Sequence, residues 1–388
     1  MNYRLIKESL YSLLAIPYKV AMKNNCNKVY NRRIKINNLN VDTPVFAEDE
    51  HVRKWRQLDR SVTPFYYRFF SNYIKPDVNI APEYTTHVYI EPILNPLQYR
   101  DYYEEKNIYD LMFPKGYLPD TILRSINGCF MDKKYFPIDI SDGILVELCN
   151  NYDRIIVKPT VDSSSGHGIM MFVKSNDKFV SVNKDSDVLS VDLLQKNYRG
   201  NFIIQEYLTQ SDFLAQFNPT SVNTIRIHAY RSVKTNEVHL IGSILRIGAS
   251  GSFCDNAHAG GLFIGIVNGR LSNCLYNQWG ESFDSFNGID FSKETFIIPN
   301  YDKIENFAKQ VAKKILHHRS IALDITLDKN NNPRLIEFNL SGFSSWLFQF
   351  TVGTAYGDFT DEVIEYCSRC KKNSNLIIGN NKTFYYHE

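Results

Sequence analysis

The stretch at residues 321–340, IALDITLDKNNNPRLIEFNL, predicts two antiparallel strands joined by a short turn. Residues 328–333 favour the turn, because Asp and Asn side chains bond to the local backbone and Pro fixes φ. If the turn is symmetric, Asp324 lies opposite Glu337, and Asn339 shares the face of Glu337. Asp and Asn are depleted in strands, so three oxygen-bearing side chains on one patch of sheet indicate a candidate site.

The oxygen-only set Asp324, Glu337 and Asn339 is a candidate for binding Mg²⁺. This ion prefers octahedral oxygen coordination and often shares its shell with substrate phosphates. The alternative is a solvated sheet face, since apolar residues alternate with this set and leave one face polar in any case. The spacing alone leaves both interpretations open.

A second pattern joins a lysine to a loop of small residues. Residues 154–157 form an apolar predicted strand that ends at Lys158, and serines and glycines follow before another predicted strand at 169–173. Such a loop can lay backbone N–H groups over phosphates, and the lysine supplies a compact positive charge. It is not a Walker A loop, because neither Lys-Ser/Thr nor a helix follows the glycines. Taken alone, a hairpin of this composition is more often simply a turn.

Two predicted paired strands, at 224–231 and 238–245, carry Arg226 and Arg246. Arginine in mid-strand among polar groups suggests a cleft that binds phosphate or carboxylate. In the polar turn that follows, His258 could act as a base, although a hydrogen-bonded structural histidine is the simpler interpretation. The predicted strand at 202–205 leads to a backbone edge that could read adenine, with Asp212 placed for ribose hydroxyls; surface charge is the alternative for these acidic groups.

The element pattern predicts an α+β chain. We expect helices through residues 1–75, a strand at 87–90, helices from 99 to 134, mostly antiparallel strands afterwards and a helix at 300–318. The expected parts are a basic helical extension (1–75), a connecting region (76–135), a smaller subdomain (136–210), a larger subdomain (211–370) and a tail (371–388).

Composition excludes some classes of protein. The net charge of +2 gives no electrostatic case for nucleic acid, and no apolar run approaches the roughly 20 residues of a membrane span. The scattered cysteines, with one CxxC at Cys367 and Cys370, indicate reduced thiols in a cytoplasmic protein. The basic first 35 residues suit either a helix docked on the body or a helix at the inner face of an anionic membrane, and we expect the docked helix. The oligomeric state is open.

Taken in order, eight motifs resemble the ATP-grasp superfamily. The chain is most similar to the sugar-transfer-associated ATP-grasp family, whose members accompany surface-polysaccharide genes. The lysine motifs also resemble D-alanine–D-alanine ligase, and the arginine and DNAHAGG motifs resemble bacterial glutamate-ligating ATP-grasp enzymes. The resemblance covers roughly residues 120–360. The motifs are MDK (131–133), VKP (157–159) with SSSGHG (163–168), IIQEYL (203–208), NTIRIH (223–228), SILR (243–246), DNAHAGG (255–261), LDITLD (323–328) and LIEFN (335–339).

The resemblance implies an ATP-grasp fold, in which two α+β subdomains clasp ATP between antiparallel sheets, here with a helical N-terminal extension. It also implies a role for each matching position. These are Lys133 and Lys158 on the ATP phosphates; Ser164, Ser165, Gly166 and Gly168 in a phosphate lid; Gln205, Glu206, Tyr207 and Leu208 at adenine; Asp212 at ribose; Asp324, Glu337 and Asn339 on Mg²⁺; Arg246 and Asn256 at the γ-phosphate and acyl-phosphate, with His258 beside them; and Arg226 on the acceptor side or behind the metal carboxylates.

The implied activity is ADP-forming ligation of a carboxylate to an amine, and the candidate substrates are small molecules, sugar-linked ones among them. A kinase that phosphorylates a hydroxyl would show the same ATP motifs, and a non-catalytic nucleotide-binding module is a further alternative. A glycosyltransferase with a metal DxD at residues 185–187 is disfavoured, since that stretch is predicted to be a loop. One departure concerns the acceptor end: related ligases often carry Ser/Thr-Pro-Gly after EFN, whereas this chain has Leu-Ser-Gly-Phe at 340–343.

Overall fold

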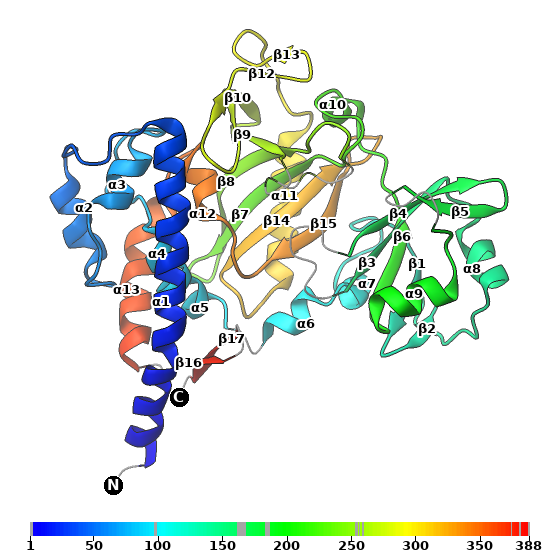
Figure 1. The fold of residues 1–388 in the computed structure, drawn as a ribbon, viewed down its shortest axis with the longest axis horizontal. Coiled ribbons are helices and arrows are strands. Elements are labelled where there is room, and N and C mark those ends of the chain that lie inside the picture. Colours follow the sequence, from blue (N-terminus) through cyan, green and yellow to red (C-terminus); the bar gives the residue numbers. More distant parts are fainter. Residues whose placement is uncertain are drawn as a thin grey trace. The chain divides into compact units, whose positions relative to one another are not determined.

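The structure of the protein is a computed structural model. The structure describes residues 3–96, 99–160, 168–182, 187–252, 255, 257, 260–373, 375–379 and 382–386, with side chains from residue 15 to residue 371. Two compact units make up the chain (Figure 1). The first combines residues 1–100, 213–325 and 337–388, and the second combines residues 101–212 and 326–336.

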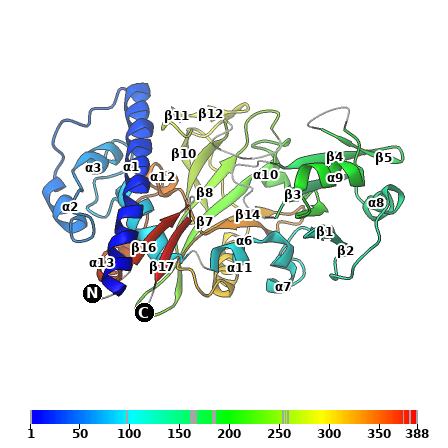
Figure 2. The ribbon, with the colours of Figure 1, turned by 60° about the horizontal axis from the view of Figure 1, so that its bottom comes forward.

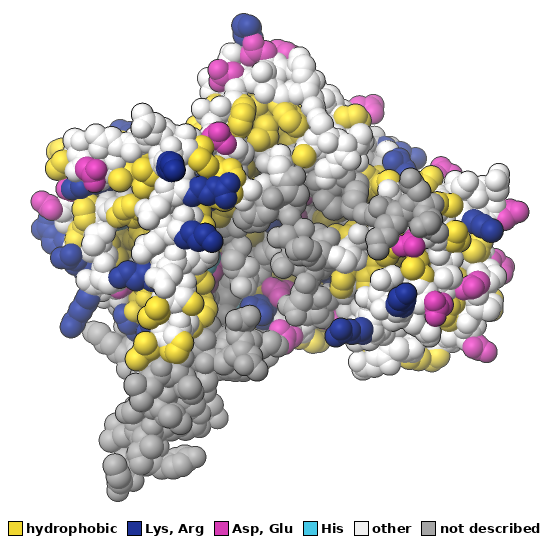
Figure 3. Space-filling view, viewed as in Figure 1, with side chains coloured by type: hydrophobic (Ala, Val, Ile, Leu, Met, Phe, Trp, Pro, Cys, Tyr) yellow, Lys and Arg dark blue, Asp and Glu magenta, His cyan; other side chains and the backbone are white. Residues whose placement is uncertain are grey.

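The first unit begins with a long helix, α1 (Tyr3–Asn37), as expected for this part of the chain. Its inner side buries Tyr30 and Arg33, and the Arg33 guanidinium stacks 4.6 Å from the ring centre of Trp346. Its outer side carries the exposed Lys23, Lys28 and Lys35, and Figure 3 shows basic side chains on this face of the molecule. The helix is therefore docked on the body, and its basic face is exposed. The following short helices are α2 (Glu48–Trp55), α3 (Phe65–Phe70), α4 (Glu83–Thr85), the π-helical turn η1 (Thr86–Ile90) and α5 (Glu91–Leu94).

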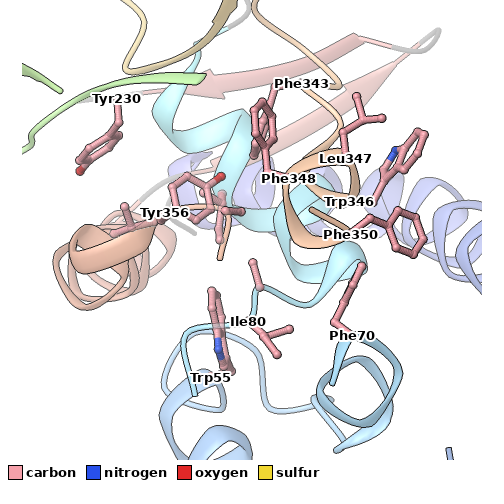
Figure 4. Packing of buried hydrophobic residues seen from close by; sticks show 14 of the residues in the cluster. Trp55, Phe70, Ile80, Tyr230, Phe343, Trp346, Leu347, Phe348, Phe350 and Tyr356 are labelled. Atoms are coloured by element: carbon pink, nitrogen blue, oxygen red, sulfur yellow. The ribbon is translucent and has the colours of Figure 1, made fainter. Parts of the chain in front are cut away.

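A cluster of aromatic and aliphatic side chains joins these helices to the C-terminal part of the chain (Figure 4). Trp55, Phe70 and Ile80 come from the N-terminal region and are fully buried against Phe348 and Tyr356. Each large apolar side chain buried in this way stabilises the fold by about 1.5–3 kcal/mol. The N-terminal helices are therefore part of the core of this unit. The C-terminal elements here are α12 (Ser345–Gln349), η6 (Gly357–Phe359), α13 (Thr360–Asn373) and the hairpin β16 (Asn375–Gly379) and β17 (Lys382–Tyr386).

A seven-stranded antiparallel sheet runs in the order β11-β10-β9-β8-β7-β14-β15. Its centre is β7 (Thr224–Arg231), which pairs with β8 (Val238–Ile247) on one side and with β14 (Ser320–Leu327) on the other. The amphipathic helix α11 (Tyr301–Lys314) packs on β7 and β8, and Figure 2 shows it beside the sheet. The remaining strands of this unit are β9 (Leu262–Val267), β10 (Arg270–Tyr276), β11 (Ser282–Phe283), the small pair β12 (Ser285–Phe286) and β13 (Ile289–Asp290), and β15 (Pro333–Asn339).

The second unit contains a six-stranded antiparallel sheet in the order β2-β1-β6-β3-β4-β5. Its helices α8 and α9 begin where Ser141 and Ser190 accept a backbone N–H in the first turn, as N-cap serines do. Apolar residues of these helices and strands form a separate core, including the fully buried Leu145 and Phe202. The elements are α6 (Arg100–Glu104), η3 (Lys106–Ile108), α7 (Tyr109–Met112), β1 (Thr121–Ile126), β2 (Cys129–Met131), α8 (Asp142–Cys149), β3 (Arg154–Pro159), β4 (Met170–Ser175), β5 (Lys178–Ser181), α9 (Val191–Tyr198) and β6 (Phe202–Glu206). The short helix α10 (Asp212–Ala215) begins at residue 212 of this unit and continues into the first unit.

Two secondary-structure expectations are wrong. Residues 87–90 are helical, and only a helix brings Glu83 and Glu91 within bonding distance of His87, since residues four apart in a strand lie about 13 Å apart. Residues 121–131 form the hairpin of β1 and β2, although the sequence was expected to be helical up to residue 134. The turn is Asn127-Gly128, with both residues at positive φ (52° and 82°), and Asn-Gly between apolar runs is a strong hairpin signal. The other expected strands and the helix near 300–318 are confirmed.

Two further sequence expectations concern membranes and thiols. Of the helices that the structure describes, none is both long and apolar enough to cross a membrane.

Cys367 and Cys370 lie on α13 as free thiols, and Cys367 is fully buried. Its burial raises the pKa of the Cys367 thiol well above its ordinary value, so this CxxC has the character of packed core and not of a reactive pair.

Candidate functional site

The central strands bring Arg226 and Asp324 directly opposite each other. Arg226 donates from Nε to Oδ1 of Asp324 at 2.7 Å and from Nη2 to Oδ2 at 2.6 Å. The carboxylate is 2% exposed and the arginine is 8% exposed. This is a bidentate ion pair, in which a planar guanidinium matches the geometry of a carboxylate.

Arg246 extends the pair into a network. It lies at the end of β8 opposite Thr224, and its Nη1 donates to Oδ2 of Asp324 at 3.0 Å. Its Nη2 lies 3.3 Å from Oδ1 of Asp255, and Oδ2 of Asp255 accepts a hydrogen bond from Thr224 Oγ1. One carboxylate thus holds both arginines, and a second carboxylate fixes the outer one.

The charges of this network explain its protonation. Burial works to raise the pKa of Asp324, but Arg226 and Arg246 together hold it below its ordinary value. Burial also opposes the charge of Arg246, yet Asp255, Asp324 and Glu337 raise its pKa above the ordinary value. For Asp255, the effect of burial is larger than the opposing effect of the Arg246 charge, so the pKa of Asp255 is raised. Arg246 therefore keeps its charge at a buried position, where Asp324 and Asp255 balance the two arginines.

The hairpin of β14 and β15 adds Glu337 and Asn339. Asn339 Nδ2 donates to Oδ2 of Asp324 at 3.4 Å, and Glu337 is close enough for its charge to raise the pKa of Arg246. A symmetric turn was expected from the sequence, but the turn is asymmetric. The backbone N–H of Asp328 donates to the carbonyl oxygen of Asn332 at 2.9 Å, so residue 328 pairs with residue 332. Burial along β15 is also out of phase, because its buried residues are three apart, at 335 and 338.

The oxygens of Glu337 and Asn339 fit the preference of Mg²⁺. Both oxygens of Asp324 already accept guanidinium hydrogens, so Asp324 would have to share an oxygen in order to coordinate a metal. Within the described ranges there is no cluster of three or more His, Cys, Asp or Glu side chains that could hold a metal ion. The expected set differs from such a cluster, since it contains one asparagine and leaves coordination positions for phosphate and water.

The expected nucleotide-binding residues that are described lie in the second unit. Lys158 is 7% exposed in β3 and pairs in register with Ile203 of β6, while Lys133 follows β2 and is exposed. Gly168 has φ of 76°, and an added Cβ would lie 2.8 Å from Pro159, so only glycine fits the end of this loop.

The chain segment after β6 carries the expected adenine and ribose positions. Gln205 is buried, and Glu206 Oε1 accepts a hydrogen bond from Asp120 N at 2.9 Å. Tyr207 lies under the guanidinium of Arg154, at 4.7 Å from the ring centre. Leu208 is 6% exposed, and Asp212 begins α10.

Five predicted positions, Ser164, Ser165, Gly166, Asn256 and His258, lie outside the described residues. The roles expected for all the site residues therefore remain predictions, and what the structure adds is the placement of the others. It brings Arg226, Arg246, Asp324, Glu337 and Asn339 together within the first unit.

Sequence reasoning missed two supporting residues. Asp255 was seen only as part of a polar turn, although it fixes Arg246. Arg124 is fully buried in β1, where it donates to Asp110 Oδ2 at 2.6 Å and to the carbonyl oxygen of Lys133 at 3.4 Å. Recognition of the Asn-Gly hairpin would have placed this arginine in mid-strand, beside the predicted phosphate-binding lysine.

The model of the sugar-transfer-associated ATP-grasp family matches residues 119–361, which is more than half of the chain. No curated protein sequence matches. Solved structures with a similar fold include N5-carboxyaminoimidazole ribonucleotide synthetase from Thermotoga maritima (10% identity, TM-score 0.36, 75% of this chain and 54% of that one). They also include D-alanine–D-alanine ligase from Coxiella burnetii (10%, 0.38, 70% and 60%) and a biotin carboxylase complex from Campylobacter jejuni (10%, 0.38, 74% and 50%).

The chain spans only about half to three-fifths of the length of these solved chains (54%, 60% and 50%). The family assignment rests on the match over residues 119–361, which contains every site residue predicted from the sequence. The antiparallel sheets with flanking helices agree with it. The chain therefore belongs to the sugar-transfer-associated ATP-grasp family.

Proposed function

We propose that the protein is an ADP-forming carboxylate–amine ligase that uses Mg-ATP. The observation that supports this most directly is the buried pair of arginines, Arg226 and Arg246, held by Asp324 beside Glu337 and Asn339. Fixed guanidinium groups next to oxygen ligands form a site for a phosphate that carries a metal and reacts with a second anion.

In the proposed reaction, Lys133 and Lys158 bind the ATP phosphates, and residues 205–208 with Asp212 hold the nucleoside. Glu337 and Asn339, with Asp324 sharing an oxygen, would hold Mg²⁺. When bound, the ion neutralises phosphate oxygens and orients them for in-line transfer.

The arginines stabilise the negative charge of the reacting phosphate that Mg²⁺ does not neutralise. A substrate carboxylate oxygen attacks the γ-phosphorus, the bond from that phosphorus to the bridging oxygen breaks, and ADP leaves. Arg246, the outer arginine, faces the transferred phosphoryl group, and Arg226 is the deeper support that keeps Asp324 in place. An amine then attacks the acyl-phosphate carbonyl, and inorganic phosphate leaves as the amide forms.

For substrates we propose an amino acid and a sugar acid or amino sugar, joined during the synthesis of a surface polysaccharide. This rests on the family description, which associates these proteins with sugar transfer. We propose cytoplasmic action on small molecules, without nucleic acid.

The decisive experiment measures ATP consumption with Mg²⁺ against a panel of amino acids with uronic-acid and amino-sugar acceptors, and separates ADP from AMP by chromatography. The ligase reaction requires ADP and phosphate that form only when a carboxylate and an amine are both present. ADP together with a phosphorylated hydroxyl would establish a kinase instead. AMP would refute the acyl-phosphate route, and tight Mg-ATP binding without turnover across the panel would favour a non-catalytic module.

A further inference from the structure

The segment that directly follows the site strand is held by residues from outside the matched family region. The loop at residues 340–345 begins one residue after Asn339 and exposes Ser341 and Gly342. Asn95 Nδ2 donates to the carbonyl oxygen of Leu340 at 2.7 Å. The ring of Phe343 stacks on His228 of β7, with ring centres 4.5 Å apart.

Two buried glutamates provide the other attachments. The backbone N–H of Phe343 donates to Oε1 of Glu91 at 3.0 Å, and Ser345 Oγ donates to Oε2 of Glu83 at 2.7 Å. These glutamates are 7% and 5% exposed, so the bonds are well shielded from water. Figure 4 shows Phe343 in the buried cluster that also contains Trp55, Phe70 and Ile80 of the N-terminal region.

One histidine joins the two glutamates through their remaining oxygens. His87 Nδ1 lies 2.9 Å from Glu91 Oε2, and His87 Nε2 lies 3.0 Å from Glu83 Oε1. Each glutamate therefore bonds to His87 through one oxygen and to the loop through the other. We call Glu83, His87 and Glu91 the carboxylate ladder.

The two hydrogen bonds from His87 to the glutamates require both ring nitrogens to donate. Both nitrogens carry a proton only in the charged imidazolium, so the ladder is complete only when His87 is charged. Burial lowers the pKa of His87, but Glu91 and Glu83 outweigh it and raise the pKa well above the ordinary value. Burial also works to raise the pKa of Glu83, yet the hydrogen bond from His87 keeps it below its ordinary value. The other titratable or charged groups that act on the ladder are Tyr18, Cys26, Tyr30 and Arg33 of α1, Tyr66 of α3, and Tyr356.

We propose that the carboxylate ladder is a positioning device that fixes the acceptor-end loop of the site, residues 340–345, to the N-terminal helices. The acceptor role of this loop depends on the proposed ligase function, whereas the coupling between the ladder and the loop does not. The ladder restrains this loop through its hydrogen bonds to the backbone N–H of Phe343 and to the hydroxyl of Ser345. Ser344 lies at positive φ (62°), a costly conformation for a residue other than glycine, and the surrounding contacts hold it there.

Hydrogen–deuterium exchange of the full chain tests this coupling without any substrate. We expect His87→Gln to increase amide exchange in the peptide that spans residues 340–349 at least about tenfold near pH 7, since charge-assisted bonds are lost. Ser345→Ala removes one attachment and leaves the ladder intact, so it should loosen the loop without changing exchange in residues 83–91. His51→Gln is the matched control: His51 is buried in the same unit and bonds to Val78 O at 3.1 Å, away from the loop.

The pH profile separates positioning from general destabilisation. In the wild type the restraint is fully present below the unfolded pKa of histidine, near 6.5, and weakens as the pH rises through the raised pKa of His87. Protection of residues 340–349 should therefore fall at alkaline pH, and this step should be absent in His87→Gln. Equal loosening by His87→Gln and His51→Gln, or a loop unaffected by Ser345→Ala, would overturn the proposal.

With substrates identified by the ATP-consumption panel, the same variants test the acceptor role. We expect Ser345→Ala to raise KM for the acceptor while KM for ATP stays unchanged. An unchanged acceptor KM alongside a loosened loop would retain the coupling and refute the acceptor role. Failure of the ligase assay itself would leave the exchange result standing, so the two proposals fail separately.

Discussion

The replacement of Asp324 by Asn tests whether this carboxylate holds the arginines of the site. Asp324 is 2% exposed and accepts guanidinium hydrogens from Arg226, at 2.7 and 2.6 Å, and from Arg246, at 3.0 Å. Asparagine offers one acceptor oxygen and one amino group, so at least one guanidinium hydrogen would face a donor. The negative charge is lost as well. Removal of one partner of a buried ion pair costs about 3–5 kcal/mol, and we expect the free energy of unfolding to fall by about this amount.

Urea unfolding followed by tryptophan fluorescence measures this loss. All three tryptophans, Trp55, Trp279 and Trp346, belong to the unit that contains Asp324, so their signal reports the unfolding of that unit. The control is Asp361→Asn: its side chain is 81% exposed and pairs with Lys54 at 2.7 Å. An exposed pair contributes about 0–1 kcal/mol, so this control should change little. A cost for Asp324→Asn no larger than that of the control would refute the assignment of Asp324 as the anchor.

Three further predictions concern ATP, metal and pH. Lys133→Met should weaken binding of a non-hydrolysable ATP analogue at least about tenfold by calorimetry, since a charge-assisted phosphate contact is lost; a similar effect of exposed Lys134→Met would contradict a specific role. Glu337→Gln should raise the Mg²⁺ concentration for half-maximal ATP turnover at least about tenfold, whereas an unchanged midpoint would remove Glu337 from the metal set. Burial lowers the pKa of His228 to about 4 in the folded protein, whereas its pKa in the unfolded chain is near 6.5. Below pH 6.5 the unfolded chain therefore binds a proton that the buried histidine does not, and the protein loses about 3 kcal/mol of stability as the pH falls toward 4. Replacing His228 with Gln should remove that part of the acid sensitivity in urea titrations, and an identical pH slope in both proteins would show that His228 does not cause it.

Local pattern predicted much of the fold. Short runs rich in β-branched residues located β7, β9 and β14, and a 3.6-residue period located α11, because these signals lie within one element. The same reasoning failed at residues 87–90 and 121–131. In the first case, valine, tyrosine and isoleucine favour a strand locally, but ion pairs between side chains four residues apart require a helix. In the second, the Asn-Gly turn was present in the sequence and was overlooked.

The sequence by itself determined which residue types the candidate site contains and, through the order of its motifs, the family. It could not determine that Arg226 faces Asp324, since these residues are 98 positions apart and meet only because β7 lies beside β14. The same holds for the ladder at residues 83–91, whose second set of oxygens reaches a loop more than 250 residues away. Hydrophobic periodicity acts within an element, whereas strand order and the partners of buried charges depend on how all elements pack together. For that reason only the tertiary structure decided which charges neutralise each other at the site and which part of the chain holds its acceptor end.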